Sequence, residues 1–219
     1  MALVLHQHPF ASYCQKALIA FYELRLTFDR VLVEDRQEHL RLWPLGSIPV
    51  LVDTDAGLTI PESTTIIEHL DALAGGGRLI PSDPEAALQA RLWDRIVDNQ
   101  VANQMAKVVT DNLRPEGRSD PEGVAEARAT ISTAYGVLQQ QLTGRTWLAG
   151  EDFTVADCAA APALFYCRAI HRWEADAHLE LMRYYRALLA RPSFARVVEE
   201  ARPYRELFPL LWPDDFDDA

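Results

Sequence analysis

The chain has 219 residues, of which 49% are hydrophobic, a composition that supports a packed core and argues against disorder. Its formal net charge of −11 argues against a general nucleic-acid binder, because such proteins need a basic face that displaces counterions from phosphates. No apolar run approaches the roughly 20 residues that span a bilayer, and residues 1–10 lack the basic and apolar regions of a secretory signal, so we expect a cytoplasmic protein.

Strands and helices alternate in the first third of the chain. The apolar run from Leu3 to Leu5 predicts a short strand, and residues 27–33 predict a second one. Between them lies a predicted helix over residues 12–24, whose buried face is formed by Cys14, Ala17, Leu18 and Phe21.

A hairpin and a helix are predicted next. Residues 49–52 predict a third strand, and the turn at residues 55–57 leads into a fourth strand over residues 58–60. Apolar residues then repeat at helical spacing from Ile66 to Leu73, and three consecutive glycines end that helix. The order βαβ, hairpin, helix is that of a thioredoxin-like domain.

Every periodic segment after Pro84 is helical. We expect helices over residues 84–112, 121–142, from 154 onward, 177–189 and 193–200. The sequence therefore predicts an α/β thioredoxin-like domain over residues 1–78, a linker at 79–83, and an all-helical domain over residues 84–219. Thr154 and Asp157 have the spacing of a capping box, worth about 1 kcal/mol to the helix that they begin.

The stretch from Ile48 to Ser63 carries the most specific functional pattern. Pro49 enters a strand and has no N–H to donate. If the Ile48–Pro49 bond is cis, the N–H and C=O of Ile48 turn outward and can pair with an extended peptide as a strand edge does. The alternative is an ordinary trans bond in a turn.

The second half of this stretch predicts a site for charged groups. Ser63 lies at or just before a helix start, where free N–H groups and the helix dipole favour a carboxylate. Glu62 beside it can bind an ammonium group, so a ligand with both charges on one carbon would be held at both. Simple helix capping is the alternative, and Thr65 with Glu68 could equally form the cap.

Residues 44–52, followed by Ile60-Pro61-Glu62-Ser63, resemble the glutathione-site signature of the cytosolic glutathione transferases. Residues 154–157 resemble the capping box of that family. The resemblance covers essentially the whole chain and implies that Ile48 pairs with the cysteinyl part of glutathione beside a cis Pro49. It also implies that Glu62 and Ser63 hold the γ-glutamyl end, and that the protein is a homodimer active in detoxification.

The reacting residue of the family falls within residues 9–16. Aligned on Cys14 and Lys16, the usual Ser or Cys coincides with Ala11; aligned on Pro9, Ser12 takes this role after a shift of one residue. We predict that Ser12 donates to the glutathione thiolate and lowers the pKa of the thiol from about 8.5. Simple capping of the helix is the alternative role of Ser12.

Two neighbours of Ser12 offer alternative chemistry. Cys14 could form a mixed disulfide with glutathione, or it could be packed inside the domain. Tyr13 could supply the hydroxyl instead. Three cysteines are too few and too scattered for a disulfide scaffold or a zinc site, and we expect no metal.

A second pocket should hold the electrophile. The family pattern implies a pocket between the first loop and the long helix, with Phe10, Val101, Met105 and Val108 as candidate lining residues. Ordinary helix-bundle core is the alternative for the three helical residues. The apolar residues 208–212 either cover this pocket or seal the helical domain.

The main functional prediction is conjugation of the glutathione thiolate to a small hydrophobic electrophile, with glutathione as cosubstrate. A glutathione-dependent isomerase is a second reading. A third is a binding or regulatory module with little catalysis, which Ala11 supports. Ser47 supports it too, because many relatives carry a lysine there for the glycyl carboxylate, and so does Trp43 in place of the usual asparagine.

Overall fold

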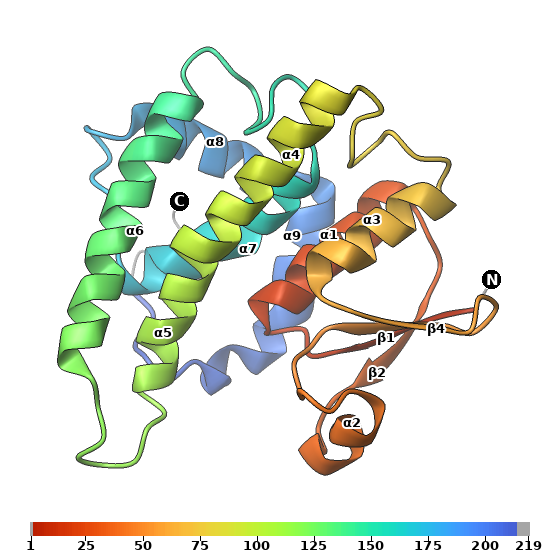
Figure 1. Ribbon diagram of the computed structural model, residues 1–219. Coiled ribbons are helices and arrows are strands. Elements are labelled where there is room, and N and C mark those ends of the chain that lie inside the picture. The colour runs from red at the N-terminus through yellow and green to blue at the C-terminus, as the bar shows by residue number, and fades with distance from the viewer. Residues whose placement is uncertain (1, 214–219) are drawn as a thin grey trace.

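The computed structural model describes residues 2–213 and contains a four-stranded sheet (Figure 1). The strands are β1 (Leu3–Gln7), β2 (Asp29–Leu32), β3 (Val50–Asp53) and β4 (Leu58–Pro61), in the order β2-β1-β3-β4. β1 runs parallel to β2 and antiparallel to β3, and β3 is antiparallel to β4. The parallel pair requires a crossover, which a helix supplies, whereas the antiparallel pair β3–β4 needs only a turn.

The sheet is covered by helices on its two faces. Figure 1 shows α1 (Ser12–Leu24) and α3 (Ser63–Leu73) on one face and α2 (Arg36–Leu42) near the other. Burial alternates along β1, since Leu3 and Leu5 lie in the core while Val4 and His6 are partly exposed. The face that Leu3 and Leu5 share therefore packs against α1 and α3.

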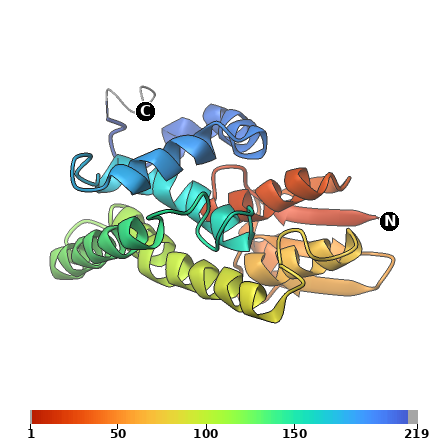
Figure 2. The same ribbon diagram turned by 90° about the horizontal axis from the view of Figure 1, so that it is seen from above.

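The remainder of the described chain is helical, and Figure 2 shows these helices beside the sheet domain. The elements are α4 (Pro84–Val97), the π-helix η1 (Asp98–Ala102), α5 (Asn103–Asp111), α6 (Pro121–Gln141), α7 (Val155–Ile170), α8 (Leu179–Leu189), α9 (Pro192–Ala201) and the 3₁₀ helix η2 (Arg202–Leu207). The predicted fold class is confirmed. None of the helices within residues 2–213 is both long and apolar enough to cross a membrane.

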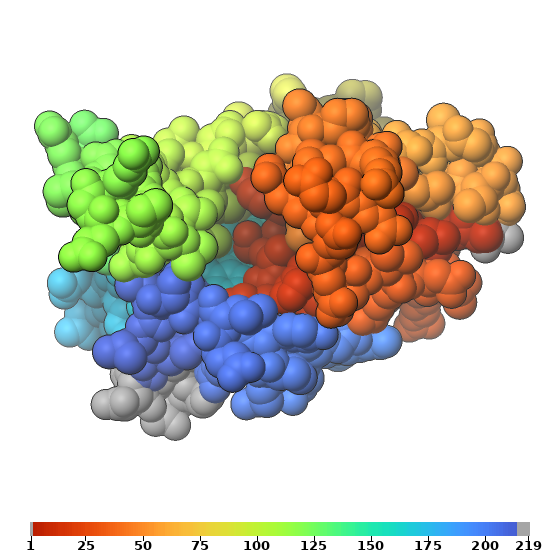
Figure 3. Space-filling view, turned by 90° about the horizontal axis from the view of Figure 1, so that it is seen from below, coloured from red at the N-terminus to blue at the C-terminus, as the bar shows by residue number. Residues whose placement is uncertain are grey.

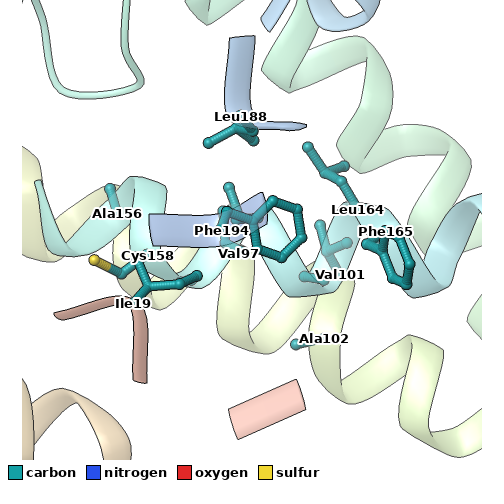
Figure 4. Close-up of a cluster of buried hydrophobic side chains, with 14 of the residues drawn as sticks. Ile19, Val97, Val101, Ala102, Ala156, Cys158, Leu164, Phe165, Leu188 and Phe194 are labelled. Atoms are coloured by element: carbon teal, nitrogen blue, oxygen red, sulfur yellow. The ribbon is translucent and has the colours of Figure 1, made fainter. Parts of the chain in front are cut away.

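One hydrophobic core extends through both halves of the molecule. Its centre is α7, nearly all of whose residues are buried. Figure 4 shows side chains that converge there from α1 (Ile19), α4 (Val97), α7 (Leu164) and α9 (Phe194). Because α1 belongs to the sheet domain and packs against α7, the two halves are fixed relative to each other.

A buried capping box begins α7, as predicted. Asp157 accepts hydrogen bonds from the N–H of Thr154 at 2.8 Å and from the Thr154 hydroxyl at 3.2 Å. The same carboxylate accepts from the Leu148 N–H at 3.0 Å and the Tyr184 hydroxyl at 2.6 Å. One fully buried side chain therefore joins the start of α7, the loop before it and α8.

Replacing Asp157 with alanine should destabilise the fold strongly, because it leaves several buried donors without an acceptor. We expect a loss of about 3 kcal/mol in the free energy of unfolding, measured by urea denaturation. Asp152→Ala is the control, since Asp152 is exposed and should change stability by less than about 0.5 kcal/mol. Equal effects of the two substitutions would contradict a structural role for the Asp157 network.

Candidate functional site

A polar cleft of about 450 Å³ lies where the sheet domain meets the long helix. Its walls come from Tyr13 of α1, residues 47–49 before β3, residues 62–65 at the start of α3, and Asp98 and Asn103 on the rod formed by α4, η1 and α5. In the space-filling view this region is a hollow between the orange segment around α2, the green helical segment and the blue C-terminal segment, and red atoms of the N-terminal part lie within it (Figure 3).

The Ile48–Pro49 segment forms one wall of the cleft. The peptide bond between these residues is cis, as the resemblance implied. Pro49 is buried and Ile48 is partly exposed, and β3 pairs with β4 only from Val50 onward. No backbone–backbone hydrogen bond joins Ile48 to another residue of the described chain, so its N–H and C=O are available to a ligand.

The opposite wall is the N-terminus of α3. Glu62 is the residue before the helix and has φ of 70°, a value that non-glycine residues rarely adopt and that often marks functional positions. Ser63 is the first helical residue and is 5% exposed. Because the first intrahelical bond runs from the Ile66 N–H to the Glu62 C=O, the N–H groups of residues 63–65 point out of the helix end.

This geometry decides between the two predicted caps. The helix begins at Ser63, so Thr65 already lies within it and is not the capping residue. Among the described residues Glu68 receives no hydrogen bond from the helix start, and its carboxylate instead accepts from Arg91 at 2.7 Å. The carboxylate of Glu62 makes no capping bond and is exposed beside the cleft.

The N-terminus of α1 also opens on this region. Ala11 precedes the helix and offers no side-chain cap, and the first intrahelical bond runs from the Gln15 N–H to the Ala11 C=O. Residues 12–14 therefore direct their N–H groups out of the helix end. Two helix N-termini, each with a partial positive charge, thus lie close to one site.

The two candidate hydroxyl groups lie in different surroundings. Ser12 lines an adjoining apolar pocket but not the polar cleft, whereas Tyr13 lines both. The Tyr13 hydroxyl donates to Asn103 Oδ1 at 2.8 Å. Burial, with a smaller contribution from the charge of Asp98, raises the pKa of Tyr13, so this phenol keeps its proton at neutral pH.

A buried ion network supports the floor of the cleft. Lys16 Nζ lies 2.6 Å from Asp94 Oδ1 and 2.8 Å from Asp98 Oδ2, and it donates to Thr64 Oγ1 at 2.9 Å. Thr64 in turn donates to Asp94 at 2.8 Å. Burial raises the pKa of Asp98, and the charge of Lys16 opposes this shift. The network ties α1, α3 and α4 together beneath the site.

The sequence contains only part of the signal for this network. Asp94 and Asp98 are four residues apart on one helix, and this spacing puts both carboxylates on the same face. Nothing in the local pattern distinguishes Lys16 from an exposed lysine. Arg95 and Asn103 also line the cleft, on either side of the π-helix η1, and periodicity does not reveal a π-helix.

An apolar pocket of about 310 Å³ adjoins the polar cleft, and Tyr13 and Ile48 line both. Phe10 and Met105, two of the predicted electrophile-pocket residues, lie in its wall. Phe208 from the C-terminal segment completes it and stacks on Trp212 with ring centroids 4.4 Å apart. Phe208 therefore covers the pocket, which is the first of the two roles considered for residues 208–212.

Val101 and Val108 do not line this pocket, contrary to their expected placement. Both are 0% exposed and belong to the hydrophobic core. They do share a helical stripe with Met105, but that stripe faces the neighbouring helices. The pocket is lined instead by the adjacent face of α5, and Met105 lies at the boundary between the two faces. The residues on this face are Ala106, Val109 and Thr110, and Leu113 follows just after the helix.

The three cysteines are all buried and unpaired. Burial raises the pKa of the Cys14 thiol to about 12, and a hydrogen bond that the sulfur accepts from the His8 backbone only partly opposes the shift. Burial also raises the pKa of Cys167 to about 12 and raises that of Cys158 well above its ordinary value. Within residues 2–213 no group of three His, Cys, Asp or Glu side chains could hold a metal ion.

Iodoacetamide should therefore leave Cys14 unmodified in the folded protein at pH 7, because a thiol with a pKa of about 12 is ionised in only about 1 molecule in 100,000. Intact-mass spectrometry should show no adduct under native conditions and three adducts in denaturant. Oxidised glutathione should likewise give no mixed disulfide. A native adduct on Cys14 would restore this residue as a candidate nucleophile.

Comparison with known proteins agrees with this architecture. Residues 5–78 match the family model of the glutathione S-transferase N-terminal domain, and residues 121–187 match that of the C-terminal domain. Glutathione S-transferase GstB of Escherichia coli K12 is 24% identical over 84% of this chain and 91% of its own. FtsZ-localized protein A of Caulobacter vibrioides is 28% identical over 97% of each chain.

A solved structure is similar over nearly the same range. The crystal structure of a glutathione S-transferase from Methylobacillus flagellatus with GSH bound has a TM-score of 0.81 and 28% sequence identity, covering 89% of this chain and 98% of that one. The two family models together match more than half of the residues and account for both halves of the fold. This chain belongs to the glutathione S-transferase family.

Proposed function

We propose that the protein is a glutathione transferase that joins the glutathione thiolate to a small hydrophobic electrophile. The observation that carries the proposal is the junction of two sites: the polar cleft adjoins the apolar pocket, and Tyr13 and Ile48 line both. A thiol at that junction would face a polar cradle on one side and an apolar partner on the other. The polar volume of about 450 Å³ lies within the range of small-molecule sites.

The cleft offers partners for the γ-glutamyl and cysteinyl parts of glutathione. The free N–H groups at the start of α3 and the Ser63 hydroxyl would bind the γ-glutamyl carboxylate, and Glu62 would bind its ammonium group. The backbone of Ile48 would pair with the cysteinyl residue. The bound GSH in the structure from Methylobacillus flagellatus supports this assignment of the ligand.

The reaction requires an ionised thiol next to the electrophile. Only about 3% of an unperturbed thiol is ionised at pH 7, so complete ionisation would increase the nucleophile roughly thirty-fold, equivalent to about 2 kcal/mol. We propose that the Ser12 hydroxyl and the free N–H groups of α1 supply this stabilisation. The thiolate sulfur then bonds to carbon, and either a leaving group departs with its electron pair or a proton adds to the product.

We also propose that the protein is a homodimer that acts in the cytoplasm, as its family resemblance suggests. Leu88 and Leu92 are 62% and 44% exposed on one side of α4 and could be covered in such a dimer. Light scattering during size-exclusion chromatography should then give about twice the chain mass of 24.7 kDa.

A binding protein with little catalysis is the second candidate function. Ala11 supports it, because this residue precedes α1 where the resemblance places the reacting hydroxyl or thiol. The match to FtsZ-localized protein A over nearly the entire chain also shows that relatives with names unrelated to catalysis share this fold. Both candidate functions require the glutathione cleft or its equivalent, but only the first requires thiol activation.

Glutathione binding should depend on the start of α3. We expect Ser63→Ala and Glu62→Gln each to weaken binding by about tenfold in isothermal titration calorimetry, since each removes a charge-assisted hydrogen bond. Ser119→Ala, in the exposed loop before α6, is the matched control and should bind glutathione normally. No heat of binding with the unmodified protein would reject both the site and the transferase.

Thiol activation separates the two hydroxyl candidates. We expect Ser12→Ala to raise the pKa of bound glutathione by about one unit, observed as thiolate absorbance during a pH titration, whereas Tyr13→Phe should not. The reverse result would transfer the role to Tyr13, whose hydroxyl lies at the junction of the two sites. An ordinary thiol pKa in the unmodified complex would favour the binding protein.

A further inference from the structure

An arginine-rich groove lies at the opposite end of α1 from the glutathione cleft. The helix has 13 residues, so its two ends are about 20 Å apart. The groove consists of two adjoining hollows of about 700 and 470 Å³, which share Tyr22, Arg25 and Arg196. It runs between the end of α1, the beginning of β2 and α9, which lies beside α1 in Figure 1.

The groove is positively charged although the protein is acidic. Five arginines line it, Arg25, Arg30, Arg78, Arg191 and Arg196, against three carboxylates, Glu23, Asp29 and Glu200. The whole chain carries a formal net charge of −11. A local excess of arginine on such a surface creates a positive potential that attracts an anionic partner.

Three of these arginines are held in place by neighbours. Arg191 donates twice to Glu23, at 2.7 and 2.8 Å, and its guanidinium lies 3.8 Å from the centre of the Phe153 ring. Glu200 accepts from Arg30 and from Arg196, each at 2.9 Å. Two of the three carboxylates are therefore already engaged, and the groove has a rigid frame.

The remaining two arginines have free hydrogen-bonding capacity. Arg25 is exposed, and no hydrogen bond or ion pair joins its guanidinium to another residue of the described chain. Arg78 donates only to the main-chain carbonyl of Glu23, at 2.8 Å. Arg25 also ends α1 with φ of 55°, a position where glycine is favoured and where a larger side chain costs stability.

An unpaired strand edge borders the larger hollow. β2 is at the edge of the sheet and pairs only with β1 among the described residues, and its first two residues, with the two before them, line the hollow. Val31 on the same strand is 40% exposed. Such an edge can accept an extended peptide through main-chain hydrogen bonds.

We propose that this groove binds an extended acidic segment of a partner protein. The guanidinium groups of Arg25 and Arg78 bind carboxylates of the segment with their remaining donors, and its main chain pairs with β2. The arginines are distributed over two hollows, which suits side chains repeating along an extended chain better than a single compact anion. This inference does not depend on the proposed transferase activity.

The test uses the full chain and a fluorescein-labelled peptide of about eight alternating glutamate and valine residues, followed by fluorescence anisotropy. We expect saturable binding that weakens as salt rises from roughly 50 to 200 mM. Arg25→Gly should weaken binding about threefold. The same substitution should leave the melting temperature unchanged or raise it, because glycine adopts the left-handed backbone conformation of this position without the strain that arginine incurs.

Two controls make the outcome decisive. Arg118→Gly removes the same charge from an exposed loop outside the groove and should bind the peptide normally. A peptide with glutamine in place of each glutamate should bind much more weakly. Equal binding of the glutamine peptide, or unchanged binding by Arg25→Gly, would overturn the proposal. Arg25-dependent binding of tripolyphosphate without binding of the peptide would overturn it too, in favour of a small-anion site.

Discussion

The cleft depends on one buried ammonium group that joins three helices. Lys16 Nζ contacts Asp94, Asp98 and Thr64, and so uses all its donors within a region closed to water. A buried ion pair contributes little net stability compared with an apolar core, but losing one partner costs several kcal/mol because the others stay buried and uncompensated. The network therefore acts mainly by allowing only one arrangement of α1, α3 and α4.

The hydrophobic core makes that arrangement rigid. α7 lies at the centre of the molecule and packs against both α1 of the sheet domain and α4 of the helical one. Its start is held by the four hydrogen bonds that Asp157 accepts. A cleft between two independently moving domains would change shape, whereas this one lies on a single packed core and keeps its two helix N-termini in fixed positions.

The cleft and the arginine-rich groove lie at opposite ends of α1 within this rigid frame. At one end of α1, the helix N-terminus, the Ile48 backbone and the start of α3 surround a polar cleft beside an apolar pocket. At the other end, Arg25, whose backbone is in the left-handed region, and neighbouring arginines form a positively charged groove. Ala11 has no hydroxyl or thiol, so the proposed activation of a thiol rests on the helix end and one nearby hydroxyl.

The sequence by itself determined the fold class, the order of elements and the capping box at Thr154 and Asp157, because periodicity and capping act between residues close in the chain. It also predicted that Ile48 and Ser63 take part in one binding site, and both line the polar cleft. Only the tertiary structure decided which helix face lines the apolar pocket, because Val101, Met105 and Val108 share a stripe whose neighbours are distant in sequence. The pairing of Lys16 with Asp94 and Asp98 could not be predicted from the sequence for the same reason. Whether a charge is buried depends on the residues that pack around it, and no local pattern encodes those.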